Sequence, residues 1–292
     1  MPQPQRIVDA HHHLWDIERN RYPWDFSYLA QDYTADVGAA PVVGTVHVEA
    51  AHDPHHPVAE TRWLEEVAQH SGFPQAIVAY APLESAALRQ LLDDHAAASP
   101  RLRGIRQMLN WEPQDQIARR PGLLDDPAWE AGLDELARRE LSFDLQVFPS
   151  QLQRAAEVVA AHPEVLFILN HGGYLQQATD ERDDLWRAGL RALAASENVV
   201  VKASAYGSVE PAFSEEGLTR YVTELAEVFG VERLLWGSNV PVEKQHVSFT
   251  NQLDAFLRVT ADWSVTERAA FYAENALRIY RIDEADLLAP AE

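Results

Sequence analysis

Eight short runs rich in β-branched and aromatic residues recur along this chain, and most are separated by segments with a helical pattern. In segments such as 58–72, 127–140 and 216–230, apolar residues recur at three- and four-residue spacing, which predicts amphipathic helices. Strands that alternate with helices of this length predict a parallel sheet, and eight such units predict a closed (β/α)8 TIM barrel. The eight predicted strands are 6–13, 41–50, 75–83, 102–109, 141–149, 165–173, 198–205 and 233–242.

The whole chain, 1–292, is predicted to form one α/β domain, because barrels of this class commonly have this length. The aromatic-rich stretch 14–40 has little periodicity, and we expect it to form an irregular loop over the mouth of the barrel. An open, doubly wound sheet is the alternative, but it would predict a glycine-rich phosphate-binding turn after an early strand. The turn after the first strand is instead rich in histidine and tryptophan, which favours the barrel.

Charge and cysteine content exclude several kinds of partner. With 24 Lys and Arg against 45 Asp and Glu, the formal net charge is −21, which repels nucleic acids and anionic membrane surfaces. We therefore expect a small-molecule substrate and no nucleic-acid or membrane partner. The chain has no cysteine, which rules out disulfides and thiol nucleophiles. No signal-like or membrane-spanning stretch is evident, so a cytoplasmic location is expected, while the oligomeric state, homo-oligomer included, stays open.

The stretch "IVDAHHHLWD" places three consecutive histidines at the end of the first predicted strand. In barrels of this kind the catalytic side chains lie at the carboxyl ends of the strands. Because side chains alternate along a strand, Asp9, His11 and His13 are predicted to share one face and His12 the other. Buried histidines often only satisfy a hydrogen bond, but this position favours a functional role for His11 and His13. Asp9 lies deeper in the strand, where an orienting role is expected.

Other predicted strands end in polar side chains of the same kind. His171 on the sixth strand precedes Gly172 and Gly173, which let the backbone approach a ligand closely. Each of these side chains also has a structural alternative, such as an ion pair between Glu243 and Lys244. The remaining candidates are His47 and Glu49 on the second strand, Asp144 and Gln146 on the fifth, Lys202 on the seventh, and Asn239 followed by Glu243 on the eighth.

Two arginines on the fourth predicted strand are candidates for holding a substrate. A guanidinium fork matches the two oxygens of a carboxylate, and Arg103 and Arg106 both lie in "LRGIRQML". They have opposite parity, so a regular strand can direct only one of them inward. We favour Arg106, with Gly104 as its small inward neighbour. Trp24 is expected to wall the pocket, with ordinary packing within its loop as the alternative.

Several motifs together resemble a known family. "DAHHHLWD", "GTVHVEA", "LRGIRQML", "LNHGG", "VVVKASA" and "WGSNVPVEK" occur in an order and spacing similar to the amidohydrolase superfamily, and the similarity runs almost end to end. Within it the chain resembles the lactonase branch, similar to 2-pyrone-4,6-dicarboxylate lactonase and L-fuconolactonase or L-rhamnonolactonase. The resemblance implies a (β/α)8 barrel and hydrolysis of a cyclic ester. It also implies catalytic roles for His11, His13 and His171, and substrate binding by Arg103 and Arg106.

One position departs from the family pattern. The family's eighth strand reads Gly-Ser-Asp-x-Pro, and its aspartate serves as general base or metal ligand, whereas this chain has Asn239. An amide cannot accept a proton at neutral pH and is a poor ligand for zinc. We therefore expect the general base to be His171, Glu49 or Glu243, with Asn239 donating to an oxygen.

A bound metal is a further open question. His11, His13 and His171, with one of the two carboxylates, would be adequate for one divalent ion such as zinc or manganese. The resemblance implies either case, since the family includes metal-free and metal-containing enzymes. The absent aspartate favours the metal-free case.

These features predict a hydrolase that opens the lactone of a sugar acid or small carboxylic acid by attack of an activated water. One alternative is a decarboxylase or related C–C lyase on the same barrel, which the absent aspartate disfavours. The other is a non-catalytic barrel that has lost its strand-eight base, which the many histidines disfavour. The residues predicted to contact the substrate are Arg106, Arg103, His47, Asp144, Gln146, Lys202 and Trp24.

Overall fold

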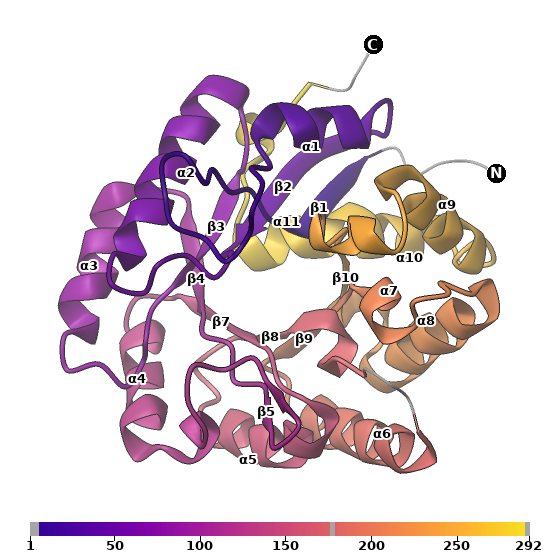
Figure 1. Ribbon diagram of the computed structural model, residues 1–292. Coiled ribbons are helices and arrows are strands. Elements are labelled where there is room, and N and C mark those ends of the chain that lie inside the picture. The colour runs from indigo at the N-terminus through magenta and orange to yellow at the C-terminus, as the bar shows by residue number, and fades with distance from the viewer. Residues whose placement is uncertain (1–5, 176–178, 290–292) are drawn as a thin grey trace.

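The computed structural model describes residues 6–175 and 179–289 and contains an eight-stranded parallel barrel surrounded by helices (Figure 1). All eight strands lie where the sequence predicted them, and each is shorter than predicted. The ends of the predicted domain, 1–5 and 290–292, lie outside the described residues, as do 176–178. The barrel strands are β1 (Ile7–His12), β2 (Val42–Val48), β3 (Ala76–Tyr80), β4 (Leu102–Arg106), β7 (Ser142–Leu145), β8 (Phe167–Leu169), β9 (Val199–Ala203) and β10 (Leu234–Trp236).

The barrel closes between β1 and β10 through hydrogen bonds at their carboxyl ends. The backbone N–H of Asn239 donates to the carbonyl of His11 (2.7 Å), and that of His13 donates to the carbonyl of Val240 (2.8 Å). Gly237 permits this approach, because a Cβ there would lie 2.8 Å from the Cβ of His11. The predicted (β/α)8 barrel is confirmed, and the open doubly wound sheet is excluded.

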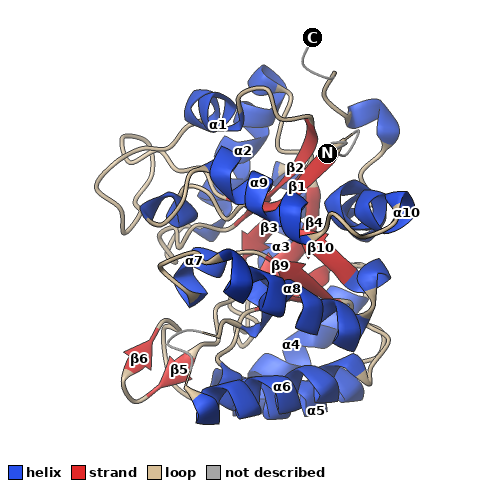
Figure 2. Cartoon of the chain, turned by 90° about the vertical axis from the view of Figure 1, so that its right-hand side faces the viewer, coloured by secondary structure: helices blue, strands red, loops and turns tan. Residues whose placement is uncertain are grey.

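Helices surround the strands on the outside of the barrel (Figure 2). α4 begins at Pro127, and the side chain of Asp126 caps it by accepting the backbone N–H of Ala128 (2.8 Å). The helices are α1 (Ala30–Val37), α2 (Pro57–Ser71), α3 (Leu88–Ala98), α4 (Pro127–Ala137), α5 (Leu152–Ala161), α6 (Asp180–Ala194), α7 (Tyr206–Val209), α8 (Glu215–Phe229), α9 (Phe249–Val259), α10 (Val265–Ala269) and α11 (Asn275–Tyr280).

Two segments at the mouth differ from the remaining connections. The stretch 14–40, predicted to be a mostly irregular loop, also contains the short helix α1. Between β4 and α4 the chain forms a small hairpin of β5 (Trp111–Glu112) and β6 (Asp115–Gln116). Within residues 6–175 and 179–289, no helix has the length and apolarity needed to cross a membrane.

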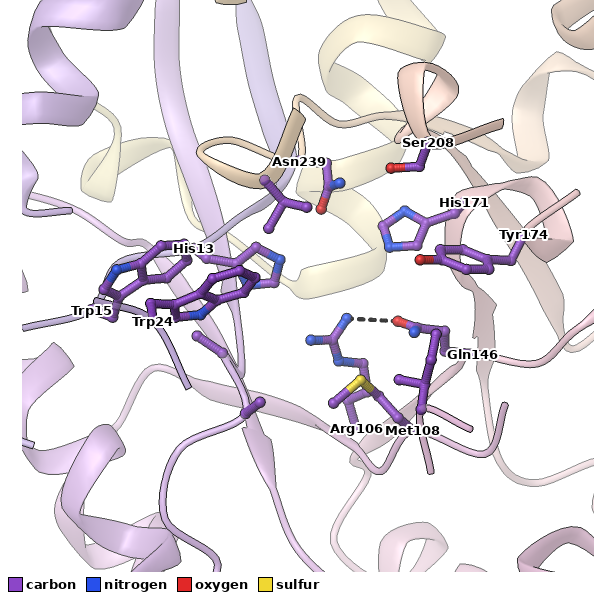
Figure 3. Close-up of a pocket in the computed structure, with 14 residues that line it drawn as sticks. His13, Trp15, Trp24, Arg106, Met108, Gln146, His171, Tyr174, Ser208 and Asn239 are labelled. Atoms are coloured by element: carbon purple, nitrogen blue, oxygen red, sulfur yellow. Dashed lines mark hydrogen bonds between the residues drawn. The ribbon is translucent and has the colours of Figure 1, made fainter. Parts of the chain in front are cut away.

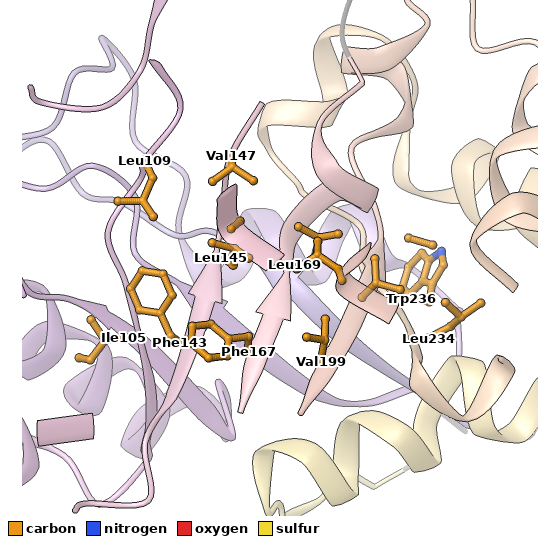
Figure 4. Close-up of a cluster of buried hydrophobic side chains, with 14 of the residues drawn as sticks. Ile105, Leu109, Phe143, Leu145, Val147, Phe167, Leu169, Val199, Leu234 and Trp236 are labelled. Carbon is orange, nitrogen blue, oxygen red and sulfur yellow. The ribbon is translucent and has the colours of Figure 1, made fainter. Parts of the chain in front are cut away.

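The strands separate two apolar clusters. Alternate side chains such as Phe143, Phe167 and Trp236 belong to the cluster that includes the helix residues (Figure 4). Their neighbours, such as Ile168 and Val200, belong to a second cluster inside the barrel, which α11 closes at the amino-terminal end of the strands. Further along the strands the inward positions become polar, and there the candidate site begins.

A bulge in β1 changes the predicted alternation of the first strand. The register with β2 shifts between Asp9 and His12. The carboxylate of Asp9 accepts a hydrogen bond from Tyr33 of α1 (2.9 Å), and the ring of His12 packs against the same tyrosine (4.6 Å between centroids). Asp9 therefore faces the helical layer with His12. The prediction that it shares a face with His11 and His13 is wrong, because a bulge inserts one residue into the alternation.

Candidate active site

A cavity of about 230 Å³ lies at the carboxyl ends of the strands, where the chemistry of such barrels is located. Figure 3 shows two imidazole rings, a guanidinium and two amides around one shared space, with two tryptophans at one side. The indoles of Trp15 and Trp24 stack with their centroids 4.8 Å apart. The lining consists of His13, Trp15, Trp24, Ala50, Ala51, Arg106, Met108, Ile117, Gln146, His171, Tyr174, Ser208, Asn239 and Val242.

His13 presents a lone pair to this cavity. Its Nδ1 lies 2.7 Å from the carbonyl oxygen of Val48, and a carbonyl only accepts, so Nδ1 carries the proton. The other nitrogen, Nε2, is then unprotonated and can accept a proton or a hydrogen bond. Burial, followed by the positive charge of Arg106, lowers the pKa of His13 well below 6.5, so the ring is neutral at pH 7.

His171 is the second imidazole of the lining. It lies in the 3-10 turn after β8 with a left-handed backbone (φ 56°). Its Nδ1 lies 2.8 Å from Oγ of Ser204, a contact in which either group can donate. Burial, followed by the charge of Arg106, lowers the pKa of His171 well below 6.5. The adjacent Gly172 is required, because a Cβ there would lie 2.4 Å from the hydroxyl of Tyr221.

Arg106 uses most of its donors within the protein. Nε–H donates to Oε1 of Glu49 (2.9 Å), and Nη2 donates to the backbone carbonyl of the same residue. Nη1 donates to Gln146 (2.9 Å) and Asn170 (3.4 Å). A guanidinium has five N–H bonds, so one N–H on Nη2 remains for a ligand. The cavity therefore has a single N–H from Arg106 in place of the open fork predicted for a carboxylate.

The two carboxylates predicted as general bases are not part of the cavity lining. Glu49 is 1% exposed, and its second oxygen accepts the backbone N–H of Ala51 (2.8 Å), so both oxygens are occupied. Glu243 is fully buried and accepts the backbone N–H of Gly207. Burial raises the pKa of Glu243 to about 7. Of the predicted bases, only His171 lines the cavity.

Asn239 occupies the position of the absent aspartate and lines the cavity. Its backbone is left-handed (φ 55°), a conformation that asparagine adopts more readily than most residues. Its Oδ1 is buried, and within the described structure it has no hydrogen-bond partner. Because an unpartnered buried oxygen is unfavourable, this atom is suited to accept a hydrogen bond from a ligand or a water molecule.

A second layer of polar side chains lies beneath the cavity. Nζ of Lys202 lies 2.6 Å from Oδ2 of Asp144 and 3.4 Å from Nδ1 of His11, and all three residues are fully buried. The ring of His11 packs against the rings of His13 (5.0 Å between centroids) and His171 (4.6 Å). The three histidines thus lie together, with His11 behind the other two.

Two residues predicted to bind substrate lie elsewhere. His47 is fully buried, and its Nε2 donates to the carbonyl of Leu14 (3.2 Å) on the helical side of β2. Arg103 donates to the carbonyls of Tyr280 (2.8 Å) and Pro100 (2.7 Å) at the amino-terminal end of the barrel. Both predictions are wrong, because strand parity directs these side chains away from the cavity.

Trp24 and Gln146 line the cavity where the sequence analysis placed them, but other lining residues were missed. Met108 continues the inward alternation of Gly104 and Arg106, so strand parity could have identified it. Tyr174 directly follows the turn that carries His171, but no sequence pattern identifies it as a lining residue. The missed residues are Trp15, Ala50, Ala51, Met108, Ile117, Tyr174, Ser208 and Val242.

The site's histidines meet the requirements of a metal centre only in part. A ligating imidazole turns a lone pair to the ion and usually donates its other N–H to an acceptor. His13 has this arrangement through Val48, whereas Nδ1 of His11 faces an ammonium group. Within residues 6–175 and 179–289, one group brings three donor atoms within 4.8 Å of one another, and it lies outside the barrel: Asp134, His162 and Glu164.

Known proteins resemble this chain over nearly its whole length. The uncharacterized protein y4mH of Sinorhizobium fredii is 36% identical, covering 94% of this chain and 98% of that protein. An L-fucono-1,5-lactonase of Burkholderia ambifaria is 29% identical, covering 94% and 96%. A crystal structure of an amidohydrolase from Burkholderia multivorans with bound zinc has 26% identity and a TM-score of 0.81, covering 95% and 99%. The family model described as amidohydrolase matches residues 8–282, so the chain belongs to the amidohydrolase family.

Proposed function

We propose that this protein hydrolyses the lactone of a small sugar acid. The observation that carries the proposal is one cavity that combines a lone pair on His13, the remaining N–H of Arg106 and the unpartnered Oδ1 of Asn239. Membership of the amidohydrolase family supports hydrolysis. The similarity to an L-fucono-1,5-lactonase supports a cyclic ester as the substrate.

His13 acts as the general base in the proposed reaction. Oδ1 of Asn239 accepts a hydrogen bond from the attacking water, and Nε2 of His13 takes a proton as the water oxygen bonds to the lactone carbonyl carbon. The ring C–O bond then breaks, and His13 returns the proton to the departing ring oxygen. One lactone and one water give one hydroxy acid, so atoms and charge balance without a further reactant.

His171 and Arg106 stabilise the negative charge on the carbonyl oxygen in this proposal. When the hydroxyl of Ser204 donates to Nδ1 of His171, the imidazole carries its own proton on Nε2 and directs it into the cavity. The remaining Nη2–H of Arg106 is a second donor. Donors held in place before reaction commonly supply the largest single contribution to catalysis of acyl transfer.

The cavity favours an uncharged ring over a dicarboxylate. Arg106 keeps a single N–H and is already paired with Glu49, so little positive charge is left to hold an anion. The net charge of −21 also repels anionic substrates. Stacked Trp15 and Trp24 supply an apolar wall, and pockets for small molecules combine such walls with a few placed polar groups.

These steps use side chains alone. The relative from Burkholderia multivorans has bound zinc, and three imidazoles can hold that ion when each directs a lone pair at it. His11 does not fit this role here, because its Nδ1 faces the ammonium group of Lys202. The proposed steps therefore do not involve a metal.

A panel of sugar-acid lactones and 2-pyrone-4,6-dicarboxylate, followed with a pH indicator, tests the function. We expect acid release from uncharged lactones of one preferred ring size and little or none from the dicarboxylate. Carbon dioxide release from a carboxylic acid substrate would contradict the proposal and favour a C–C lyase. Tight binding without turnover across the panel would favour a non-catalytic barrel.

The pH profile of kcat/KM distinguishes His13 from Glu243 as the base. We expect the acidic limb to lie well below pH 6.5, because the lowered pKa of His13 keeps its ring unprotonated as the pH falls. Burial raises the pKa of Glu243 to about 7, so a limb centred there would identify that carboxylate instead. Initial rates between about pH 4 and about pH 8, corrected for spontaneous hydrolysis, provide the measurement.

A further inference from the structure

We propose that Lys202 fixes the tautomer of His11, so that the Nε2–H of His11 is a buried hydrogen-bond donor beneath the cavity and cannot ligate a metal. Lys202 is then a positioning residue, acting through His11. The role of this tautomer in catalysis rests on the proposed function. The tautomer itself can be measured without any substrate.

A charged ammonium group can donate hydrogen bonds but cannot accept them. Lys202 has three N–H donors and no acceptor while it is charged. Burial lowers the pKa of Lys202, but the carboxylate of Asp144, with an oxygen 2.6 Å from Nζ, opposes this shift and favours the ammonium form. The ring of Tyr280, whose centroid lies 5.3 Å from Nζ, presents a face that attracts the cation. Nδ1 of His11, 3.4 Å away, must then accept from Lys202.

The tautomer of His11 follows from that contact. A neutral imidazole has one N–H, and burial, followed by the charge of Lys202, lowers the pKa of His11 well below 6.5. With Nδ1 as the acceptor, the single proton lies on Nε2. His13 has the opposite tautomer, because its Nδ1 donates to the carbonyl of Val48. The motif "HHH" therefore contributes one donor and one acceptor from two alternate histidines.

The Nε2 atom of His11 is the unsatisfied member of this network. It is buried and has no hydrogen-bond partner within the described structure. Its ring lies against both lining imidazoles, so the partner that fits is an oxygen atom held between His13 and His171. A buried N–H left without a partner is unfavourable, which makes the site selective for an oxygen acceptor at this point.

The same tautomer opposes metal ligation. A zinc ligand must offer a lone pair, and its other nitrogen is normally held by an acceptor such as a carbonyl or carboxylate. In His11 the second nitrogen faces a cation, which places the proton on the atom that would otherwise bind the ion. The barrel floor is thus built to donate to an oxygen, whereas a metal ligand at this position would have to direct a lone pair.

Imidazole 15N NMR of the full-length wild-type protein is the primary test. We expect the His11 signals of an Nε2–H tautomer, assigned by their loss in His11→Gln, and those of an Nδ1–H tautomer for His13. An Nδ1–H tautomer at His11 would overturn the proposal. Because the measurement needs no turnover, its outcome is independent of whether lactones are the substrates.

Zinc titration of two variants provides the second test. Lys202→Met combined with Asp144→Asn removes the ammonium without leaving a buried carboxylate unpaired, while Lys202→Arg keeps a cation paired with Asp144 and is the matched control. We expect the double variant to bind zinc about 10–100-fold more tightly than wild type, a typical effect of a group adjoining the ligands. The control should stay near wild type. Equal zinc affinity in wild type and a folded double variant would contradict the inference.

Discussion

His171→Asn should lower kcat for the preferred lactone by a factor of about 10²–10³ and leave the fold intact. An asparagine amide can take the place of Nδ1 and keep the contact with Ser204, and asparagine adopts the left-handed backbone of this position (φ 56°). It has no atom at the position of Nε2, so the proposed donor to the carbonyl oxygen is lost. Steady-state kcat and KM, with the urea unfolding midpoint of the same preparation, measure the two effects separately.

His171→Gln is the matched control for this prediction. Its longer side chain can bring an amide N–H toward the position of Nε2, so it should recover part of the lost rate. Full activity in the asparagine variant would remove His171 from the mechanism. Equal losses in both variants, at unchanged stability, would show that Nε2–H is not the group that matters.

The fold could be predicted because its periodicity repeats eight times, and one misjudged strand changes little. The ends of the strands could not be predicted, because the polar residues that mark a candidate site lie where the chain leaves the strand. At the end of β8 the residues Asn170–Gly173, which were included in the predicted strand, form a 3-10 turn. The bulge in β1 was equally hidden, since one inserted residue alters the facing of Asp9 without altering composition.

Parity predicts which face of a strand a residue occupies, but it does not predict depth. Asp144 and Gln146 have the same parity on the strand, yet Gln146 lines the cavity while Asp144 lies a layer below and pairs with Lys202. That pairing joins residues 58 positions apart, so no local pattern reveals it. Similarly, Glu49 was a plausible base until its pairing with Arg106 was seen. Sequence supplied the candidates, and the structure determined which of them already neutralise one another.

Glu49→Ala should destabilise the protein by about 3–5 kcal/mol, because it leaves the guanidinium of Arg106 buried without its counter-charge. Arg106 is 4% exposed, and its other side-chain partners, Gln146 and Asn170, are neutral. The midpoint and slope of urea unfolding measure the loss, and an unchanged slope would show that the folded and unfolded states keep their difference in exposed surface. Glu49→Gln should fall between wild type and Glu49→Ala, since an amide oxygen can still accept from Nε.

The double variant Glu49→Ala with Arg106→Met separates the unpaired charge from the lost packing. Removing both charges should recover a large part of the stability lost in Glu49→Ala, because replacing a whole buried ion pair is often close to neutral. A loss below about 1 kcal/mol in Glu49→Ala would mean that Arg106 is hydrated, as expected of an exposed pair. In that case Arg106 would keep more than one N–H for a ligand, and an anionic lactone would become the better substrate. The stability of Glu49→Ala therefore also tests the expected preference for uncharged rings.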